Sequence, residues 1–238
     1  MKTVLVVGDS LSMVRPGDGV CLEHTYPYML QEKLGGGVYM FNCSQRANDS
    51  SKIVSEGYFS ESVGAARVDF LILQLGIVDC TPRLFTDTQR KILAGLRLLP
   101  LLRASVDAVI KRKSLRRYDL TKRKRIVNVS LSEFESNIAR FLEAAKAKSP
   151  QVKIVAVNIP YPGQSMVSRN FGLIENVENY NRCLAGVVVR YSGCVVDLFE
   201  YTRACPDSVL GDGHHIGYAA HRFISGKILQ AIDLEGVV

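Results

Sequence analysis

Two short polar motifs at opposite ends of the chain contain the residue types that nucleophilic catalysis requires. Gly8-Asp9-Ser10 follows directly on the apolar run Thr3–Val7, which places a serine at the end of an expected buried strand. Asp212 lies three residues before His215 in a short, glycine-rich stretch. With this spacing, Asp212 can accept the Nδ1–H of His215 and leave Nε2 as a general base. The two motifs together favour Ser10 as a nucleophile.

Ser10 could also cap the helix that follows it or contribute to a phosphate-binding loop. The phosphate-binding loop is disfavoured because neither GxGxxG nor GxxxxGK[ST] occurs in the chain. A serine that only caps a helix would need no catalytic partner elsewhere in the chain. The distant Asp-x-x-His motif supplies such a partner and therefore favours Ser10 as a nucleophile. Among the other histidines, we expect His214 to be a turn residue, His24 a cap or surface residue and His221 a solvated residue.

The expected scaffold that positions these motifs is an α/β domain with a parallel sheet. Five apolar, β-branched runs are continuous rather than alternating, which is typical of parallel strands covered on both faces. These runs are Thr3–Val7, Val38–Phe41, Phe70–Leu75, Lys153–Asn158 and Cys194–Leu198. Helical patterns lie between the runs, and this alternation predicts a doubly wound sheet within a single domain, residues 1–238.

Three apolar stripes with helical spacing predict amphipathic helices. The first contains Phe134, Ile138, Phe141, Leu142 and Ala145, the second Leu173, Val177, Tyr180, Leu184, Val188 and Tyr191, and the third Ile216, Ala220, Phe223, Ile224 and Ile228. The sequence Ser132-Glu133-Phe134-Glu135 resembles a capping box, so we expect Ser132 to begin the first of these helices.

Composition describes an ordinary globular protein of 238 residues, 47% hydrophobic and 22% charged. No apolar stretch approaches the ~20 residues that a membrane span needs, and the first strand leaves no room for a secretory signal. The six cysteines form no CxxC pair or regular cluster, which predicts a reduced, cytoplasmic protein without a metal site.

The net charge of +7 comes mainly from one segment, Lys111–Arg125, which contains nine basic residues and one acid, Asp119. This basic block ends a helical insertion at about residues 82–130, in which Thr86 and Gln89 are expected to open a helix through Leu99. The block could be a solvated excursion, contact an anionic substrate or attach to an acidic membrane face. Nucleic acid is disfavoured because only one aromatic residue interleaves with the basic ones.

The motif Gly8-Asp9-Ser10-Leu11-Ser12, together with Asp212-x-x-His215, resembles the first and last blocks of the SGNH/GDSL hydrolases. The resemblance implies a flavodoxin-like, three-layer α/β/α sandwich with about five parallel strands. It also implies ester hydrolysis, often on carbohydrates, with Ser10 as nucleophile, His215 as base and Asp212 as orienting group. No metal or organic cofactor is expected.

The middle blocks of the chain depart from the family pattern. Ala47 stands where the family has a glycine whose N–H helps form the oxyanion hole, and Val78 replaces an asparagine that donates from its side chain. One missing donor is worth ~2.7–4 kcal/mol of transition-state stabilisation. We therefore expect the N–H groups of Ser10 and Ala47 to bind the oxyanion, provided that φ of Ala47 is negative, with Asn48 or Asn158 supplying the third donor.

Three further residues are candidates for contact with the substrate. Asp9 is expected to accept backbone hydrogen bonds in the nucleophile loop. Asp79, after the third strand, could instead hydrogen-bond to a neighbouring loop, and Tyr161 could stack on a sugar ring or only pack. The expected activity is that of a serine-dependent esterase or deacetylase acting on a carbohydrate or other small acyl ester, possibly an anionic one. The alternatives are an O-acyltransferase that modifies a surface-polysaccharide precursor, and an inactive glycan-binding relative.

Overall fold

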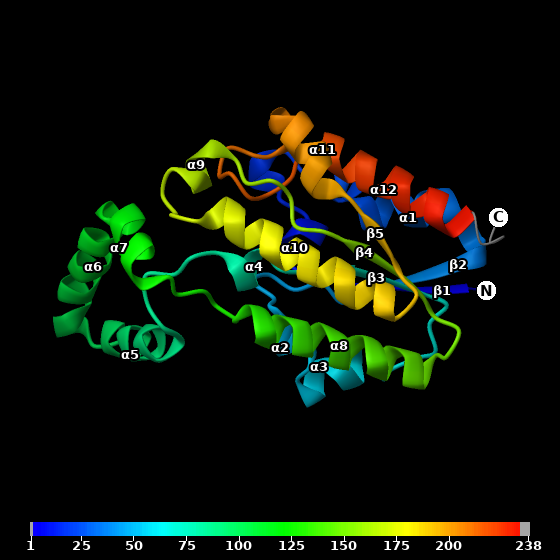
Figure 1. The fold of residues 1–238 in the computed structure, drawn as a ribbon, viewed down its shortest axis with the longest axis horizontal. Helices are drawn as coiled ribbons and strands as arrows, with labels where there is room; N and C mark the ends of the chain where they lie inside the picture. The colour runs from blue at the N-terminus through cyan, green and yellow to red at the C-terminus, as the bar shows by residue number, and fades with distance from the viewer. Residues whose placement is uncertain (1, 234–238) are drawn as a thin grey trace.

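The computed structural model describes residues 2–233 and contains one five-stranded parallel sheet (Figure 1). The strands are β1 (Lys2–Gly8), β2 (Val38–Asn42), β3 (Phe70–Gln74), β4 (Lys153–Val157) and β5 (Cys194–Val196). Their order is β2-β1-β3-β4-β5, and all neighbours are parallel. This is the doubly wound order of flavodoxin-like folds, so the expected fold class is confirmed.

Helices cover both faces of the sheet, as the continuous apolar strands predict. The helices α1 (Tyr26–Leu34) and α12 (Tyr218–Asp233) pack together on one face, with α11 (Leu198–Ala204) beside α12. The other face carries α8 (Leu131–Lys148) and α10 (Leu173–Arg190), which pack against each other, and the short α2 (Ser50–Ile53) and α3 (Glu56–Glu61). The result is a three-layer α/β/α sandwich.

The apolar stripes lie where the sequence predicts them. All five stripe residues of α8 are buried, and so are the first five of the α10 stripe. The N-terminus of α8 differs from the expectation, because the N-cap is Ser130 and not Ser132. The hydroxyl of Ser130 accepts the Glu133 N–H at 3.3 Å, and the Glu133 carboxylate accepts the Ser130 N–H at 3.0 Å. The capping box therefore begins two residues earlier.

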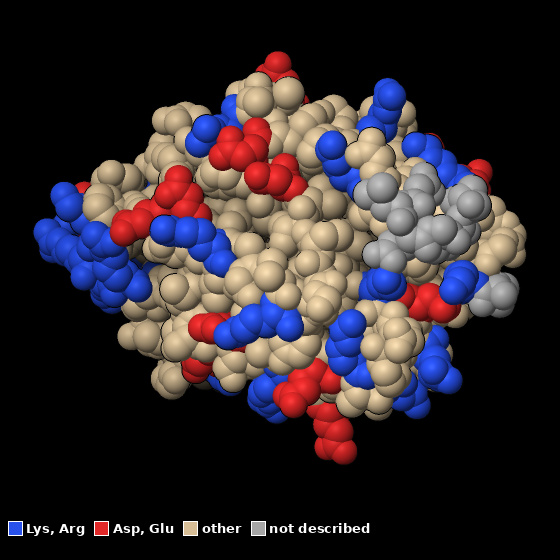
Figure 2. All heavy atoms as spheres, turned by 45° about the vertical axis from the view of Figure 1, so that its right-hand side comes forward, with Lys and Arg blue, Asp and Glu red and all other residues tan. Residues whose placement is uncertain are grey.

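The insertion folds into three helices at one end of the molecule (Figure 1): α5 (Asp87–Arg97), α6 (Pro100–Leu115) and α7 (Arg117–Lys124). Thr86 and Gln89 form the expected capping box of α5, and Pro100 begins α6 at the position where a proline is tolerated. The basic block, Lys111–Arg125, is helical along α7 and the end of α6, and Figure 2 shows Lys and Arg side chains gathered at this end.

The remaining short helices are α4 (Ile77–Cys80), which follows β3, and α9 (Gln164–Val167), which follows β4. The structure also contains 3-10 turns, of which Ser10–Ser12 follows β1. No helix within residues 2–233 combines the length and the apolar character that crossing a membrane requires.

The capping box gives a direct test of the start of α8. Replacing Ser130 with alanine removes the acceptor for the Glu133 N–H, so we expect Ser130→Ala to lower the free energy of unfolding by about 1 kcal/mol. Ser132→Ala is the matched control and should change it by less than about 0.5 kcal/mol. Urea unfolding followed by circular dichroism measures both. A larger loss in Ser132→Ala would place the cap where the sequence alone suggested.

Candidate active site

The turn that carries Ser10 is held by the two residues before it. The Oδ1 of Asp9 accepts the N–H of Leu11 at 2.8 Å and caps the 3-10 turn Ser10–Ser12. Burial raises the pKa of Asp9 to about 7. A Cβ at Gly8 would lie 2.4 Å from the Oγ of Ser12, so only glycine fits there. Asp9 thus ties the loop as expected, but it is fully buried and does not line the cleft, which corrects its assignment as a substrate-binding residue.

The loop before α12 holds Asp212 and His215 in one tight turn. The Oδ1 of Asp212 accepts the N–H groups of His214 at 3.1 Å and His215 at 3.0 Å, and its Oδ2 lies 2.5 Å from Nδ1 of His215. Partial burial raises the pKa of Asp212, but these hydrogen bonds outweigh it and hold the pKa well below its usual value. Gly213 has φ +84, and a Cβ there would lie 2.4 Å from the Oγ of Ser165. A glycine is therefore required inside this turn.

The two predicted motifs meet at Nε2 of His215. This atom lies 2.9 Å from the Oγ of Ser10 and 3.0 Å from Nη1 of Arg15. An arginine can only donate, so Nε2 is the acceptor and the ring proton is on Nδ1, toward Asp212. Burial, and next the charge of Arg15, lower the pKa of His215 against the opposing effect of Asp212. The imidazole is thus neutral and oriented as a general base requires.

Two backbone N–H groups at the cleft are available as donors to an oxyanion. Within residues 2–233, the N–H groups of Ser10 and Ala47 have no hydrogen-bond partner, and both residues line the same cleft. The φ of Ala47 is +53, not negative as expected, so an alanine occupies the left-handed conformation that favours glycine. Val78 also lines the cleft, and its side chain offers no donor.

Neither candidate for the third donor is directed at the cleft. Asn48 is fully buried, and its Nδ2 donates to the carbonyl of Gly8 at 3.1 Å. Asn158 donates to Asp197 at 2.9 Å and accepts the N–H of Phe199. The expectation that either amide serves the oxyanion is therefore wrong in this structure, since both are used to hold loops that follow strands.

Two of the expected substrate contacts are also corrected. Asp79 is fully buried, and its carboxylate accepts the N–H of Ser50 at 2.9 Å. Burial raises the pKa of Asp79 to about 6. Tyr161 packs edge-on against Phe199, with ring centroids 5.3 Å apart, and does not line the cleft. Asp79 ties α2 to α4, and Tyr161 packs against the core.

The remaining histidines differ from one another. His214 lines the cleft beside His215, so it is more than a turn residue. His24 contacts the carbonyl of Gly19 at 3.2 Å, as a surface cap would. His221 is buried rather than solvated, and its Nδ1 accepts the N–H of Tyr26 at 3.2 Å. Burial lowers the pKa of His221 to about 4, so it joins α12 to α1 as a neutral acceptor.

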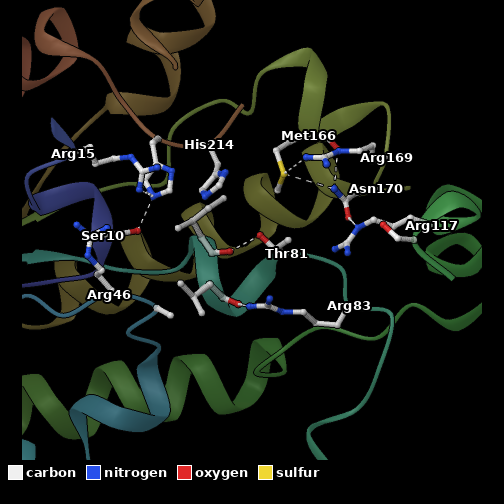
Figure 3. Close-up of a pocket in the computed structure, with 15 residues that line it drawn as sticks. Ser10, Arg15, Arg46, Thr81, Arg83, Arg117, Met166, Arg169, Asn170 and His214 are labelled. Atoms are coloured by element: carbon white, nitrogen blue, oxygen red, sulfur yellow. Dashed lines mark hydrogen bonds between the residues drawn. The ribbon is translucent and has the colours of Figure 1, made fainter. Parts of the chain in front are cut away.

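The cleft has a volume of about 450 Å³, and Figure 3 shows the residues that line it. It lies at the carboxyl ends of the strands, since Ser10, Ala47 and Val78 follow β1, β2 and β3. This size suits a small molecule, and its position is where open α/β sheets bind ligands. Most of its polar lining was not predictable from the sequence, because the charged residues come from separate segments. These residues are Arg15, Arg46, Arg83, Arg117 and Arg169. Only Arg117 belongs to the basic block.

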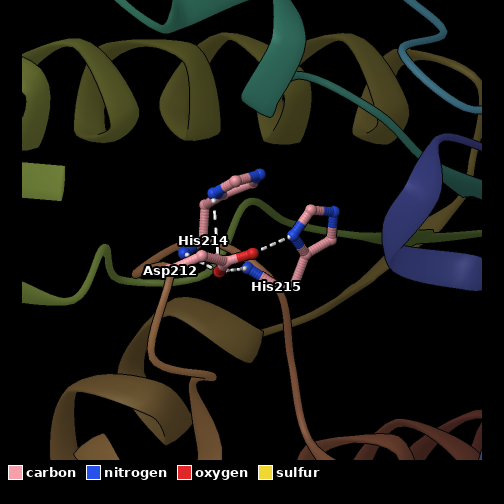
Figure 4. Close-up of side chains that lie close together, drawn as sticks. All are labelled: Asp212, His214 and His215. Carbon is pink, nitrogen blue, oxygen red and sulfur yellow. Dashed lines mark hydrogen bonds and ion pairs between the residues drawn. The ribbon is translucent and has the colours of Figure 1, made fainter. Parts of the chain in front are cut away.

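Asp212, His214 and His215 also form the one group of possible metal ligands within residues 2–233 (Figure 4), with ligand atoms within 4.8 Å of one another. The donor set does not fit a cation. The carboxylate of Asp212 is hydrogen-bonded to Nδ1 of His215. Arg15 lies 3.0 Å from Nε2 of His215 and 3.6 Å from the carboxylate of Asp212. A metal would have to break the hydrogen bond between Asp212 and His215 and bind beside the positive charge of Arg15.

The left-handed alanine predicts a stability gain. We expect Ala47→Gly to raise the free energy of unfolding by about 0.5–1 kcal/mol, because glycine adopts this conformation without a Cβ penalty. Ala144→Gly, inside α8, is the matched control and should lower it by about 0.5–1 kcal/mol. Thermal and urea unfolding compare the two variants. An equal loss in both would show that residue 47 is not left-handed in solution.

The contact between Arg15 and His215 predicts a shift in the titration of the imidazole. Removing the cation in Arg15→Met should raise the pKa of His215, because a neighbouring positive charge disfavours the protonated ring. NMR titration of the His215 ring in the wild type and the variant measures the shift. Arg46→Met removes a cleft arginine that does not contact His215 and should shift it less. An unchanged or lower pKa in Arg15→Met would contradict the contact.

Comparison with known proteins agrees with this architecture. A lipase/acylhydrolase from Enterococcus faecalis has 10% identity and a TM-score of 0.66, with 98% of this chain and 95% of that one covered. Axe2, an acetylxylan esterase from Geobacillus stearothermophilus, has 17% identity and a TM-score of 0.62, with 97% and 94% covered. TesA has 17% identity and a TM-score of 0.59, with 100% of each chain covered. At these identities the likeness shows the fold. No curated protein matches the sequence.

The match to a family model goes further than the fold. The GDSL-like lipase/acylhydrolase model matches residues 6–223, which include Ser10, Asp212 and His215. This match covers nearly the whole chain, from the first strand to the last helix. The chain therefore belongs to the GDSL-like lipase/acylhydrolase family and is a carboxylic ester hydrolase.

Proposed function

We propose that the chain hydrolyses small acyl esters with Ser10 as nucleophile, His215 as general base and Asp212 as the group that orients His215. One observation carries the proposal. The Oγ of Ser10 lies 2.9 Å from Nε2 of His215, and Nδ1 of the same ring lies 2.5 Å from Asp212. In the related acetylxylan esterase, a serine-to-alanine and a histidine-to-alanine variant are described as catalytic mutants, which supports the same roles here.

The first half of the reaction forms an acyl-enzyme. The Oγ of Ser10 attacks the acyl carbon and gives its proton to Nε2 of His215, while the N–H groups of Ser10 and Ala47 bind the oxyanion. His215 then returns the proton to the leaving alcohol. Because an N–H of Arg15 also points at Nε2, this N–H must turn away as the ring is protonated. Asp18 already accepts from Nε and Nη2 of Arg15 at 2.8 Å and can keep the guanidinium paired when it moves.

Water completes the cycle. It attacks the acyl carbon of acyl-Ser10, gives a proton to His215, and the serine leaves with that proton as the carboxylic acid is released. With Val78 in place of a side-chain donor, the oxyanion is held by two backbone N–H groups. An oxyanion hole with one donor fewer loses ~2.7–4 kcal/mol of transition-state stabilisation unless a group of the substrate compensates for the missing donor.

A carbohydrate ester is the proposed substrate class, since polar and charged side chains line the cleft and since the structural relatives include an acetylxylan esterase. Transfer of the acyl group to a sugar hydroxyl is the alternative on the same triad. It is favoured by Ser114 and Arg117, which bring the insertion to the wall of the cleft and can shield the acyl-enzyme from water. Contact of Lys111–Arg125 with an acidic membrane stays a prediction.

The triad is tested with a chromogenic acetyl ester and a serine-directed phosphonate. Ser10→Ala and His215→Ala should each lower kcat by about 10⁴-fold or more, because triad members act as a unit, and Asp212→Asn by a similar or smaller factor. The phosphonate should label the wild type and not Ser10→Ala. Ser168→Ala removes an exposed hydroxyl and is the control, which should keep both activity and labelling. Wild-type turnover in Ser10→Ala would refute the assignment.

Sugar acceptors separate hydrolysis from transfer. The ratio of acylated acceptor to free acid, measured at fixed ester and increasing acceptor, should stay low for a hydrolase. A ratio that rises to exceed one at millimolar acceptor would favour the acyltransferase.

A further inference from the structure

Three of the cleft arginines converge from different parts of the chain. Arg83 lies between α4 and α5, Arg117 begins α7, and Arg169 follows α9. All three line the same cleft as Ser10, and Figure 3 shows them at the end away from the serine. Their convergence needs the insertion, since Arg117 reaches the cleft only because α7 returns toward the sheet.

Uncharged groups hold these side chains in place. Each guanidinium donates to carbonyl oxygens or to a side-chain amide, which fix its direction but do not neutralise its charge. The acceptors are the carbonyl of Val78 for Arg83 at 2.9 Å, the carbonyl of Pro82 and the Oδ1 of Asn170 for Arg117 at 2.7 and 2.6 Å, and the carbonyl of Ser165 for Arg169 at 2.8 Å. Asn170 is itself buried and anchored to the carbonyl of Met166.

The three charges have no carboxylate partner within 4 Å among residues 2–233. Other arginines of the chain do have one, namely Arg15, Arg90, Arg97, Arg125, Arg190 and Arg203. The Nε of Arg83 is in addition buried without any hydrogen-bond partner. Burial, and next the charge of Arg90, lower the pKa of Arg83, and neither Asp49 nor Asp79, whose charges oppose this, forms an ion pair with it.

The arginines also destabilise one another. Burial, and next the charges of Arg83 and Arg169, lower the pKa of Arg117. Like charges that share a partly buried site favour the binding of an anion, because the anion relieves their repulsion and uses their free N–H groups. The site is therefore complementary to a group of more than one negative charge.

We propose that Arg83, Arg117 and Arg169 form a subsite for a phosphoryl group of the substrate, at the end of the cleft away from Ser10. A phosphoryl group presents three oxygens and up to two negative charges, which matches three guanidiniums approaching from three segments. A carboxylate has two oxygens in one plane and a single charge. The inference rests on the proposed function and narrows its substrate to an acylated, phosphorylated alcohol such as an acetylated sugar phosphate.

Binding of a sugar phosphate tests the subsite without any turnover. Calorimetry with glucose phosphate, glucose and glucuronate as probes should give at least 10-fold tighter binding of glucose phosphate by the wild type. Arg117→Gln and Arg169→Gln should each weaken it by about 10- to 100-fold. Arg116→Gln is the matched control, because the neighbouring Arg116 is exposed, does not line the cleft and carries the same charge.

Hydrolysis gives the second readout. The ratio of kcat/KM for an acetylated glucose phosphate to that for acetylated glucose should exceed 10 in the wild type and in Arg116→Gln, and should fall toward 1 in Arg117→Gln. Arg169→Gln covers the case in which Arg117→Gln disturbs α7, since Arg169 lies on another segment.

Several outcomes would overturn the subsite. They are equal binding of glucose and glucose phosphate, tighter binding of glucuronate, or equal losses in Arg116→Gln and Arg117→Gln. If turnover does not depend on Ser10 but glucose phosphate still binds through Arg117, the proposed function fails and the subsite stands.

Discussion

Because all five strands are parallel, every loop that follows a strand leaves the sheet at the same edge. Ser10, Ala47 and Val78 follow the carboxyl ends of β1, β2 and β3, so the proposed nucleophile and the groups around it are neighbours by topology. The strand order reverses direction between β1 and β3, which opens the crevice between their loops. The position of the cleft at this edge of the sheet, beside the insertion, follows from the parallel arrangement of the strands.

Hydrogen bonds from buried polar side chains hold these loops in fixed conformations. Asp9, Asn48 and Asp79 are fully buried and use their side chains to hold backbone beside the cleft. Burial raises the pKa of Asp9 and Asp79, so these acids carry less negative charge near neutral pH than exposed ones would. The buried acids beside the cleft therefore contribute little negative charge to balance the positive charge of the cleft arginines.

The features that could be predicted from the sequence are those with a local pattern. The five strands and the apolar stripes follow from periodicity, and the pairing of Ser10 with His215 follows from two short motifs. The surroundings of single polar residues were harder to predict. His221 lies next to the stripe of α12 but is buried because α1 packs on that side, and Asn48 turns inward to a carbonyl that only the folded chain brings near. The arginines of the cleft have no common spacing, so only the folded chain shows them together.

The hydrogen bond between Ser10 and His215 joins residues 205 positions apart in the chain. During synthesis Ser10 leaves the ribosome well before His215, so a chain made only part of the way lacks the hydrogen-bond partner of the serine. His215 is positioned by the segment that leads into α12, whose docking on α1 includes the hydrogen bond from Tyr26 to His221. A local opening of this segment would separate His215 from Ser10 while the sheet stays intact. Under the proposed function, loss of ester hydrolysis should therefore precede global unfolding, and enzymatic activity would report on the docking of α12.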